Sequence, residues 1–192
     1  ATTLNWASAA SVDASDRHGF TLDGEFQELR LRVERGFGSR YAAVIELPWR
    51  HMGGGTLDGF IDDWHDLFGL SAGDRPKLPR DQLLIEYRRD DAPLLRMTES
   101  RAGVGDIPVS VGVQVAASDA RALAAWVTLK LPLGRVDDLS GSDAVDVALS
   151  LAGQSRLAHR WQVFAQLDAV RLGRGELLPR LQKKFVWSGL AG

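Results

Sequence analysis

Along much of the chain, apolar residues alternate one by one with small or polar residues. In the stretch GDIPVSVGVQV, residues 105–115, every second position from Ile107 to Val115 holds a branched apolar residue. The positions between them hold Pro108, Ser110, Gly112 and Gln114. Successive side chains of a β-strand point to opposite faces of the sheet. The pattern therefore predicts a strand with one apolar face and one small or polar face.

The same period of two recurs in other segments. Together with a strand at 103–115, it predicts strands at 3–10, 25–37, 40–49, 122–133, 143–153, 160–172 and 182–192. Most of these run to roughly 9–13 residues, which exceeds the ~5–6 residues of an ordinary strand and approaches the ~9–11 residues of a strand that crosses a bilayer. No run of ~18 apolar residues is present, so no transmembrane helix is expected. The prediction is an all-β chain of about eight long antiparallel strands.

The connections between these segments alternate in length. The short ones are GFGS, AASDA and GQSRLAH, and the longer ones are 11–24, 50–102, GRVDDLSGSD and GRGELLPR. Short turns at one end and long loops at the other end are typical of bacterial outer-membrane barrels.

Residues 50–102 are predicted to form an insertion with a structure of its own. Within TLDGFIDDWHDLFGL, large apolar residues recur at helical spacing, and Gly69 follows as a stop signal. These positions are Leu57, Phe60, Ile61, Trp64, Leu67 and Phe68. The runs DQLLIEYRR and LLRMTE flank the turn DDAP, which predicts a β-hairpin. We expect the helix, 56–69, and the hairpin at the outer mouth of the barrel, as a cap or folded into the lumen.

Alternation alone does not decide which face meets water. The apolar face points inward in a soluble barrel and toward lipid in a membrane barrel. Several polar faces here lack long charged side chains, and Trp49 and Trp161 fall at strand ends, where an aromatic girdle would lie. Together with the sorting of the loops by length, these features favour an antiparallel up-and-down transmembrane β-barrel. We expect one domain over 1–192 with an extracellular insertion at 50–102. A soluble or envelope lipocalin-like barrel that binds an apolar ligand is the alternative.

Composition narrows the candidate partners. A net charge of −2 argues against a nucleic-acid partner. The absence of cysteine excludes disulfides and thiolate metal sites. The three glycines 53–55 are not followed by Lys-Ser/Thr, so they form no phosphate-binding loop. We expect membrane lipid as the partner, small solutes or ions as candidate ligands, and neither a cofactor nor enzymatic activity.

Three stretches, 51–91, 103–115 and 129–153, give the chain a resemblance to a known family. Their most specific features are the Gly-Gly pair followed by FIDDWH, and the later GSD at 141–143. The chain resembles proteobacterial outer-membrane β-barrel proteins that are catalogued as a domain of unknown function and often labelled channel-like. The resemblance implies an outer-membrane location and supplies no catalytic residues. Members of that family continue further than Gly192, which implies that this chain is a fragment of the full barrel.

The polar faces of the expected strands hold charged and amide side chains of both signs. In a barrel they would line the lumen, either as a network that holds a narrow barrel together or as a filter that selects solutes. These positions are Glu28, Arg30, Arg32, Glu34, Glu46, Lys130, Asp146, Gln166, Asp168 and Lys184.

Two further clusters are candidates for chemistry. Asp58, Asp62, His65 and Asp66 fall near one side of the predicted helix, where oxygen ligands and an imidazole are suited to a divalent cation. The competing interpretation is a solvated acidic face. Ser142 and His159 would suit serine hydrolysis only within hydrogen-bond reach of each other, and their predicted places at opposite ends of the barrel argue against it.

Overall fold

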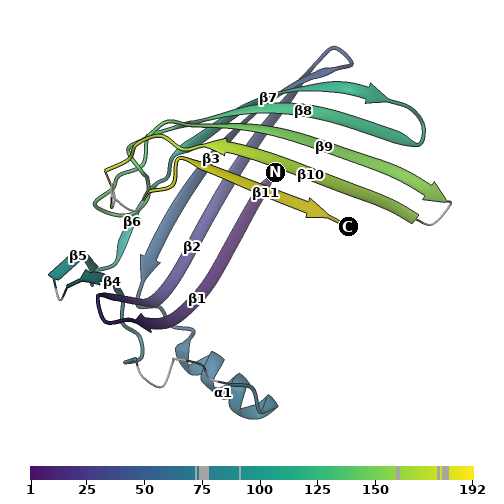
Figure 1. The fold of residues 1–192 in the computed structure, drawn as a ribbon. Coiled ribbons are helices and arrows are strands. Elements are labelled where there is room, and N and C mark those ends of the chain that lie inside the picture. The colour runs from purple at the N-terminus through teal and green to yellow at the C-terminus, as the bar shows by residue number, and fades with distance from the viewer. Residues whose placement is uncertain (72, 74–77, 91, 159–160, 177, 179–181) are drawn as a thin grey trace. The chain divides into compact units, whose positions relative to one another are not determined.

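The structure is a computed structural model that describes residues 1–192 except 72, 74–77, 91, 159–160, 177 and 179–181 (Figure 1). The described residues form one helix, α1 (Asp58–Phe68), and an 11-stranded sheet. Its strands are β1 (Thr2–Ala14), β2 (His18–Phe37), β3 (Tyr41–Gly53), β4 (Leu84–Arg89), β5 (Ala92–Met97), β6 (Arg101–Val104), β7 (Ile107–Ala117), β8 (Arg121–Leu131), β9 (Asp146–Ala158), β10 (Trp161–Arg171) and β11 (Phe185–Ala191). The prediction of a mainly antiparallel β protein is confirmed.

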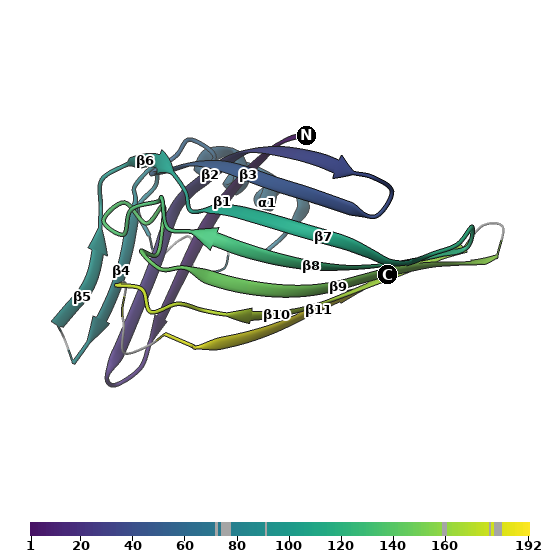
Figure 2. The ribbon, with the colours of Figure 1, turned by 90° about the horizontal axis from the view of Figure 1, so that it is seen from above.

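Most strands pair with their neighbours in the sequence. β1, β2 and β3 are consecutive partners, β3 then pairs with β7, and β7 to β11 follow in order. The registers of β3 with β7 and of the later pairs are antiparallel. Figure 2 shows β7 to β11 side by side. The meander therefore contains the eight segments that alternation predicted, with the remaining strands in the insertion.

The described strands do not close into the predicted barrel. Among the described residues, β1 pairs only with β2, and β11 pairs only with β10, so the sheet is not closed. The period of two specifies which face each side chain takes and, through this, the register between neighbours. It says nothing about whether the first and last strands meet.

The predicted long connection at 11–24 is also wrong. β1 continues to Ala14 and β2 begins at His18, with a turn in which the N–H of Ser15 donates to the carbonyl of His18 at 2.7 Å. The first residues of β2 find a second partner in the hairpin of β4 and β5, since His18 to Asp23 pair with Arg89 to Leu84. This pairing supplies backbone hydrogen bonds to a stretch that looked like a polar loop in the sequence.

The chain divides into two compact units. Unit 1 contains residues 1–2, 30–48 and 104–192, and unit 2 contains residues 3–29 and 49–103. Unit 2 has a small buried core that includes Met52, Leu83, Ile85 and Met97. In unit 1, Val44 is buried, but many large apolar side chains of its strands are exposed.

Helix α1 lies in unit 2 and ends where the sequence predicted. Gly69 follows it with φ 62°, a left-handed conformation that suits glycine.

At the start of α1, the carboxylate of Glu25, which is only 2% exposed, accepts the N–H of Thr56 at 2.7 Å and the N–H of Leu57. The indole N–H of Trp6 donates to the second oxygen of Glu25 at 2.9 Å. Glu25 thus satisfies backbone donors just before the helix. No described helix is both apolar enough and long enough to span a bilayer.

Candidate functional site

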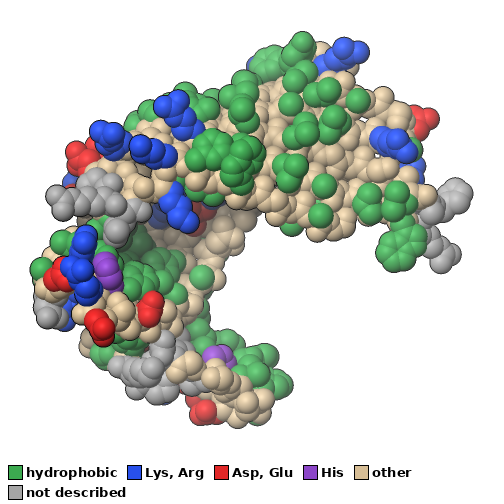
Figure 3. All heavy atoms as spheres, in the orientation of Figure 1, with side chains coloured by type: hydrophobic (Ala, Val, Ile, Leu, Met, Phe, Trp, Pro, Cys, Tyr) green, Lys and Arg blue, Asp and Glu red, His purple; other side chains and the backbone are tan. Residues whose placement is uncertain are grey.

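The strands of unit 1 present one face made almost wholly of apolar side chains, which we call the apolar face. It consists of cross-strand rows that run from β3 through β7 to β11. The central row is Ala43, Val111, Val127, Leu149, Ala169 and Trp187, and the flanking rows are Tyr41, Val113, Ala125, Leu151, Leu167, Gly189 and Ile45, Val109, Leu129, Val147, Arg171, Phe185. Figure 3 shows hydrophobic side chains spread over these strands.

The apolar face is exposed. The side chains of Val111 and Leu149 are both 57% accessible, although they lie in the middle strands of unit 1. Monomers in water rarely expose contiguous apolar surface of more than a few hundred Å². A face of six neighbouring strands that is apolar in successive rows therefore requires an apolar covering.

The opposite face of the same strands, here called the polar face, is built from small and polar side chains. The hydroxyls of Ser110 and Thr128 are hydrogen-bonded at 2.8 Å across β7 and β8. The indole ring of Trp126 lies over Gly112, where a Cβ atom would approach the ring to 2.4 Å. A hollow of about 420 Å³ lies over this part of unit 1, lined in part by Gly112, Trp126 and Gln166. Glycine at position 112 thus gives the ring its place on the polar face.

Lys130 forms the centre of an ion-pair cluster at the end of β8. Its ammonium group lies 2.9 Å from Asp106 Oδ2 and 2.7 Å from Asp146 Oδ2, and it also contacts the hydroxyl of Ser142. Ser142 donates to Asp106 through both its backbone N–H and its hydroxyl, each at 3.1 Å. The backbone N–H of Gly173 donates to Asp146 at 2.8 Å. The cluster ties the start of β7, the end of β8 and the start of β9 to the loops beside them.

The carboxylate of Asp106 is 7% exposed and is held in its charged form. Burial opposes ionisation, but the hydrogen bond from Lys130 and the backbone N–H groups of Ser142 and Gly134 outweigh it, so the pKa of Asp106 lies below its ordinary value of 3.8.

This lowered pKa predicts an acid-sensitive contribution to stability. A group with a depressed folded-state pKa stabilises the fold above its unfolded-state pKa, and the contribution disappears as the pH falls through the folded-state value. We expect Asp106→Asn to lower the free energy of unfolding at pH 7 and to flatten its decline below about pH 4. Urea titrations of both proteins at several pH values measure this difference. Parallel curves for the two proteins over the whole range would contradict it.

The arginines predicted for the lumen side of β2 meet a glutamate of β3. Arg30 lies 3.4 Å and Arg32 lies 3.2 Å from the carboxylate of Glu46, which is 17% exposed. Arg32 also pairs with Glu34 at 2.9 Å. These four residues, all of unit 1, form one network of mixed sign, as the sequence suggested for the interior of a barrel.

The other predicted lumen residues fall in separate places. In unit 2, Glu28 pairs with Arg50 at 2.9 Å, a partner that the sequence did not suggest. In unit 1, the amide of Gln166 donates to Asp168 at 2.9 Å, and the hydroxyl of Ser188 donates to the same carboxylate at 3.0 Å.

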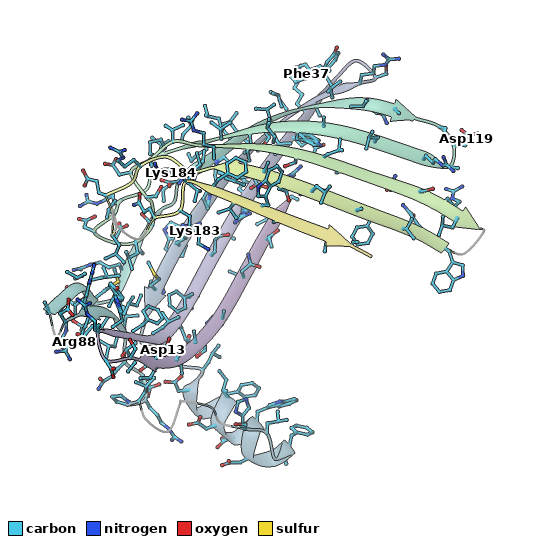
Figure 4. All side chains as sticks on the ribbon, viewed as in Figure 1. Asp13, Phe37, Arg88, Asp119, Lys183 and Lys184 are labelled. Atoms are coloured by element: carbon cyan, nitrogen blue, oxygen red, sulfur yellow. The ribbon has the colours of Figure 1, made fainter. Side chains whose placement is uncertain are left out.

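In the part of the chain that the structure describes, no hydrogen bond or ion pair joins Lys184 to another predicted lumen residue. It is exposed just before β11, beside Lys183 (Figure 4). Its backbone carbonyl accepts the N–H of Leu172 at 3.0 Å.

The comparison with known protein families gives one result that covers the whole chain. Residues 1–192 match the family described as "Protein of unknown function (DUF3187)". The chain belongs to the DUF3187 family. No curated protein and no solved structure matches this DUF3187 chain. The expected membership in a family of unknown function is confirmed, while the expected outer-membrane and proteobacterial character of the DUF3187 chain stays a prediction.

The four residues predicted as metal ligands are not gathered into one site in the DUF3187 chain. Asp58 is buried and accepts the backbone N–H of Asp81 at 2.9 Å, and Asp62 pairs with Arg80 at 2.7 Å. Among the described residues, no three His, Asp or Glu side chains are placed together so that they could hold a metal ion. With Asp58 and Asp62 bound elsewhere, His65 and Asp66 alone do not support a metal proposal.

The serine considered for hydrolysis takes part in the ion-pair cluster of the DUF3187 chain. Ser142 is bonded to Lys130 and Asp106, and His159 lies outside the described residues. Lys130 is itself paired with two carboxylates, which favour its protonated form. A protonated lysine cannot take a proton from the serine hydroxyl, so the arrangement supports a structural role for Ser142.

Sequence reasoning missed some groups that the fold places prominently. Asp106 lies between β6 and β7 in the structure; in the sequence it falls within the predicted strand 103–115 but before the first alternating apolar residue, Ile107, so the alternation gave it no role. Glu25 falls at the start of the predicted strand 25–37, and its burial depends on the loop before α1, which no local pattern predicts. The predicted outer loop is GRGELLPR, residues 173–180, and Lys184 is expected on the lumen face of the strand at 182–192, so the sequence did not group Arg174 with Lys183 and Lys184. The Lys and Arg residues that lie close together in the sequence after β10 were the signal that could have pointed to this cluster of cations.

Proposed function

We propose that this chain forms the wall of an outer-membrane β-barrel that acts as a porin-like channel or as a structural barrel. The observation that carries the proposal is the contrast between the two faces of unit 1. The apolar face is exposed in successive rows, whereas the polar face holds hydrogen-bonded hydroxyls and an ion-pair cluster. Lipid is the covering that satisfies such an apolar face, and a polar interior is what a membrane barrel encloses.

Strand lengths and connections in unit 1 support this proposal. β7 and β10 have 11 residues each and β9 has 13, lengths suited to tilted strands across a bilayer. At one end of the strands the turns are short. β2 ends at Phe37 and β3 begins at Tyr41; likewise, β7 ends at Ala117 and β8 begins at Arg121. At the other end, 132–145 and 172–184 are long. This sorting is the pattern of outer-membrane meanders.

Exposed aromatic side chains near both ends of these strands also fit a membrane-spanning wall. Tyr41 and Trp161 are 62% and 72% exposed at the short-turn end. Phe185, near the long-loop end, contacts Trp187 with ring centroids 5.0 Å apart. Amphipathic rings of this kind gather at the two interfaces of a bilayer.

A barrel requires that no strand edge stays open. β1 and β11 each have one partner among the described residues, and open edges promote association with other chains. In the proposed assembly these edges are paired, with each other or with further strands. The polar face then becomes the lumen wall, and its residues Arg30, Arg32 and Glu46 hold charge of both signs toward water. The proposal assigns the chain no catalytic activity.

Folding in lipid tests the proposal. The urea-unfolded chain, diluted into phosphatidylcholine vesicles, is expected to gain β structure and to migrate differently on a gel before and after boiling. In a detergent-free and lipid-free buffer it should aggregate. A folded, soluble monomer in that buffer would contradict the membrane assignment and would favour a lipocalin-like carrier of apolar ligands. Conductance across planar bilayers, measured with the full-length protein, separates a channel from a structural barrel.

A further inference from the structure

A pocket of about 470 Å³ lies in unit 1 where β9 and β10 meet the segment before β11. Four cationic side chains line it: Arg171, Arg174, Lys183 and Lys184. All four are exposed. Two of them, Lys183 and Lys184, come from the residues that lead into β11 (Figure 4), and Figure 3 shows Lys and Arg side chains gathered over this end of the strands.

The positive charge of this pocket is not balanced locally. Among the described residues, none of the four cations has an ion pair with a carboxylate, and no acidic side chain lines the pocket. The acidic residue at the start of β9, Asp146, is bound to Lys130 and to the backbone N–H of Gly173. Four like charges around one pocket repel each other, and an anion placed among them relieves this repulsion.

The pocket is also continuous with the apolar face. Val145 and Val147 line it, and their side chains are 47% and 38% exposed. Arg171 pairs in register with Val147 on one side and with Phe185 on the other, so a cation stands within an apolar row. A free phosphate ion or a nucleic acid would make no use of this apolar wall, whereas a lipid has an anionic head directly above apolar chains.

We propose that this pocket binds the phosphate group of an anionic membrane lipid, with the acyl chains lying along Val147 and Phe185. The proposal rests on the membrane-barrel function above and adds a specific lipid site to it. Arg171 and Lys184 hold the phosphate through charge-assisted hydrogen bonds, and Arg174 and Lys183 add to the local positive potential.

Binding of phosphatidic acid to the chain in neutral maltoside micelles, counted as retained lipid by native mass spectrometry, tests this site. Replacing Arg171 and Lys184 together with glutamine is expected to weaken binding about tenfold or more. The matched control replaces Arg121 and Arg156 with glutamine, which removes the same charge at the opposite end of β8 and β9, where both residues are exposed. This control should retain binding within about twofold, because a cation's attraction to a charged headgroup is local.

Each outcome decides the proposal. Equal losses in the two double variants would overturn it in favour of overall charge, and competition by soluble glycerol phosphate as strong as by the lipid would show a free-phosphate site instead. If a double variant fails the heat-modified migration test, the single variants Arg171→Gln and Lys184→Gln are compared with Arg121→Gln: the first two should each weaken lipid binding more than the third, and equal losses would overturn the proposal. A chain that folds in vesicles but retains no phosphatidic acid would refute this site alone, whereas failure to fold in vesicles refutes the membrane function.

Discussion

Replacing Val111 or Leu149 with arginine is expected to destabilise the chain folded in lipid vesicles by about 2–4 kcal/mol, the cost of a cation in the middle of a membrane barrel's outer surface. The two residues lie on β7 and β9 in the same cross-strand row and are equally exposed. In a water-soluble protein, a substitution at a position with 57% exposure changes stability by only about 0.5 kcal/mol or less. Urea titration of the chain in phosphatidylcholine vesicles, followed by tryptophan fluorescence, measures the effect.

Ala120→Arg provides the matched control for this experiment. Ala120 is exposed in the turn between β7 and β8, outside the apolar rows. The same cation placed there should change the unfolding free energy by about 1 kcal/mol or less, because the cost of a charge falls toward the interface. If arginine at 111 or 149 is tolerated as well as arginine at 120, the apolar face does not meet hydrocarbon.

Lys130→Met is expected to be the most damaging single change on the polar side of the sheet. It leaves Asp106 and Asp146 without their shared cation, and their side chains are 7% and 16% exposed. Removing one partner of a buried ion pair costs about 3–5 kcal/mol. Since 23% of the Lys130 side chain is accessible to solvent, we expect a loss near 3 kcal/mol. The free energy of unfolding in urea at pH 7 is the quantity to compare.

A second substitution separates charge from packing in this experiment. Adding Asp106→Asn to Lys130→Met removes one of the two carboxylates that have lost their cation, so part of the lost stability should return. The double variant would then be less destabilised than the sum of the two single changes, which is the mark of coupled residues. Strictly additive losses, or a Lys130→Met protein as stable as the original, would show that the cluster contributes no electrostatic stabilisation.

The strands and their faces could be predicted from the sequence because burial and exposure follow a period of two. Val111, Val127 and Leu149 were each assigned to the apolar side of a strand, and the register places them side by side. The helix end at Gly69 was predictable for a similar reason, since its signal is local. Closure of the sheet was not predictable, because it depends on whether β1 and β11 meet, and no local pattern specifies that contact.

The candidate site was predicted in part. Lys130 and Asp146 were placed on one face by alternation, and they do meet at 2.7 Å. Asp106, their third partner, lies outside any strand and reaches them only through the fold. The cations of the pocket proposed to bind lipid are likewise brought together only by the fold: Arg171 is on β10, and Lys184 comes before β11. Only the antiparallel register of these strands brings them to one pocket, and residue spacing along the chain does not specify that register.

β2 changes its partner along one edge. Its first residues, His18 to Asp23, pair with β4, whereas β3 is its other neighbour. Gly24, with φ 148°, follows the last residue paired to β4, and a Cβ there would lie 3.0 Å from the carbonyl oxygen of Gly53. The hairpin therefore branches off beside the end of β3, and the N–H of Gly105 donates to Pro48 at 2.8 Å where the meander resumes. Because the excursion leaves and rejoins at neighbouring points, inserting or deleting residues within it should not shift how β7 aligns with β3.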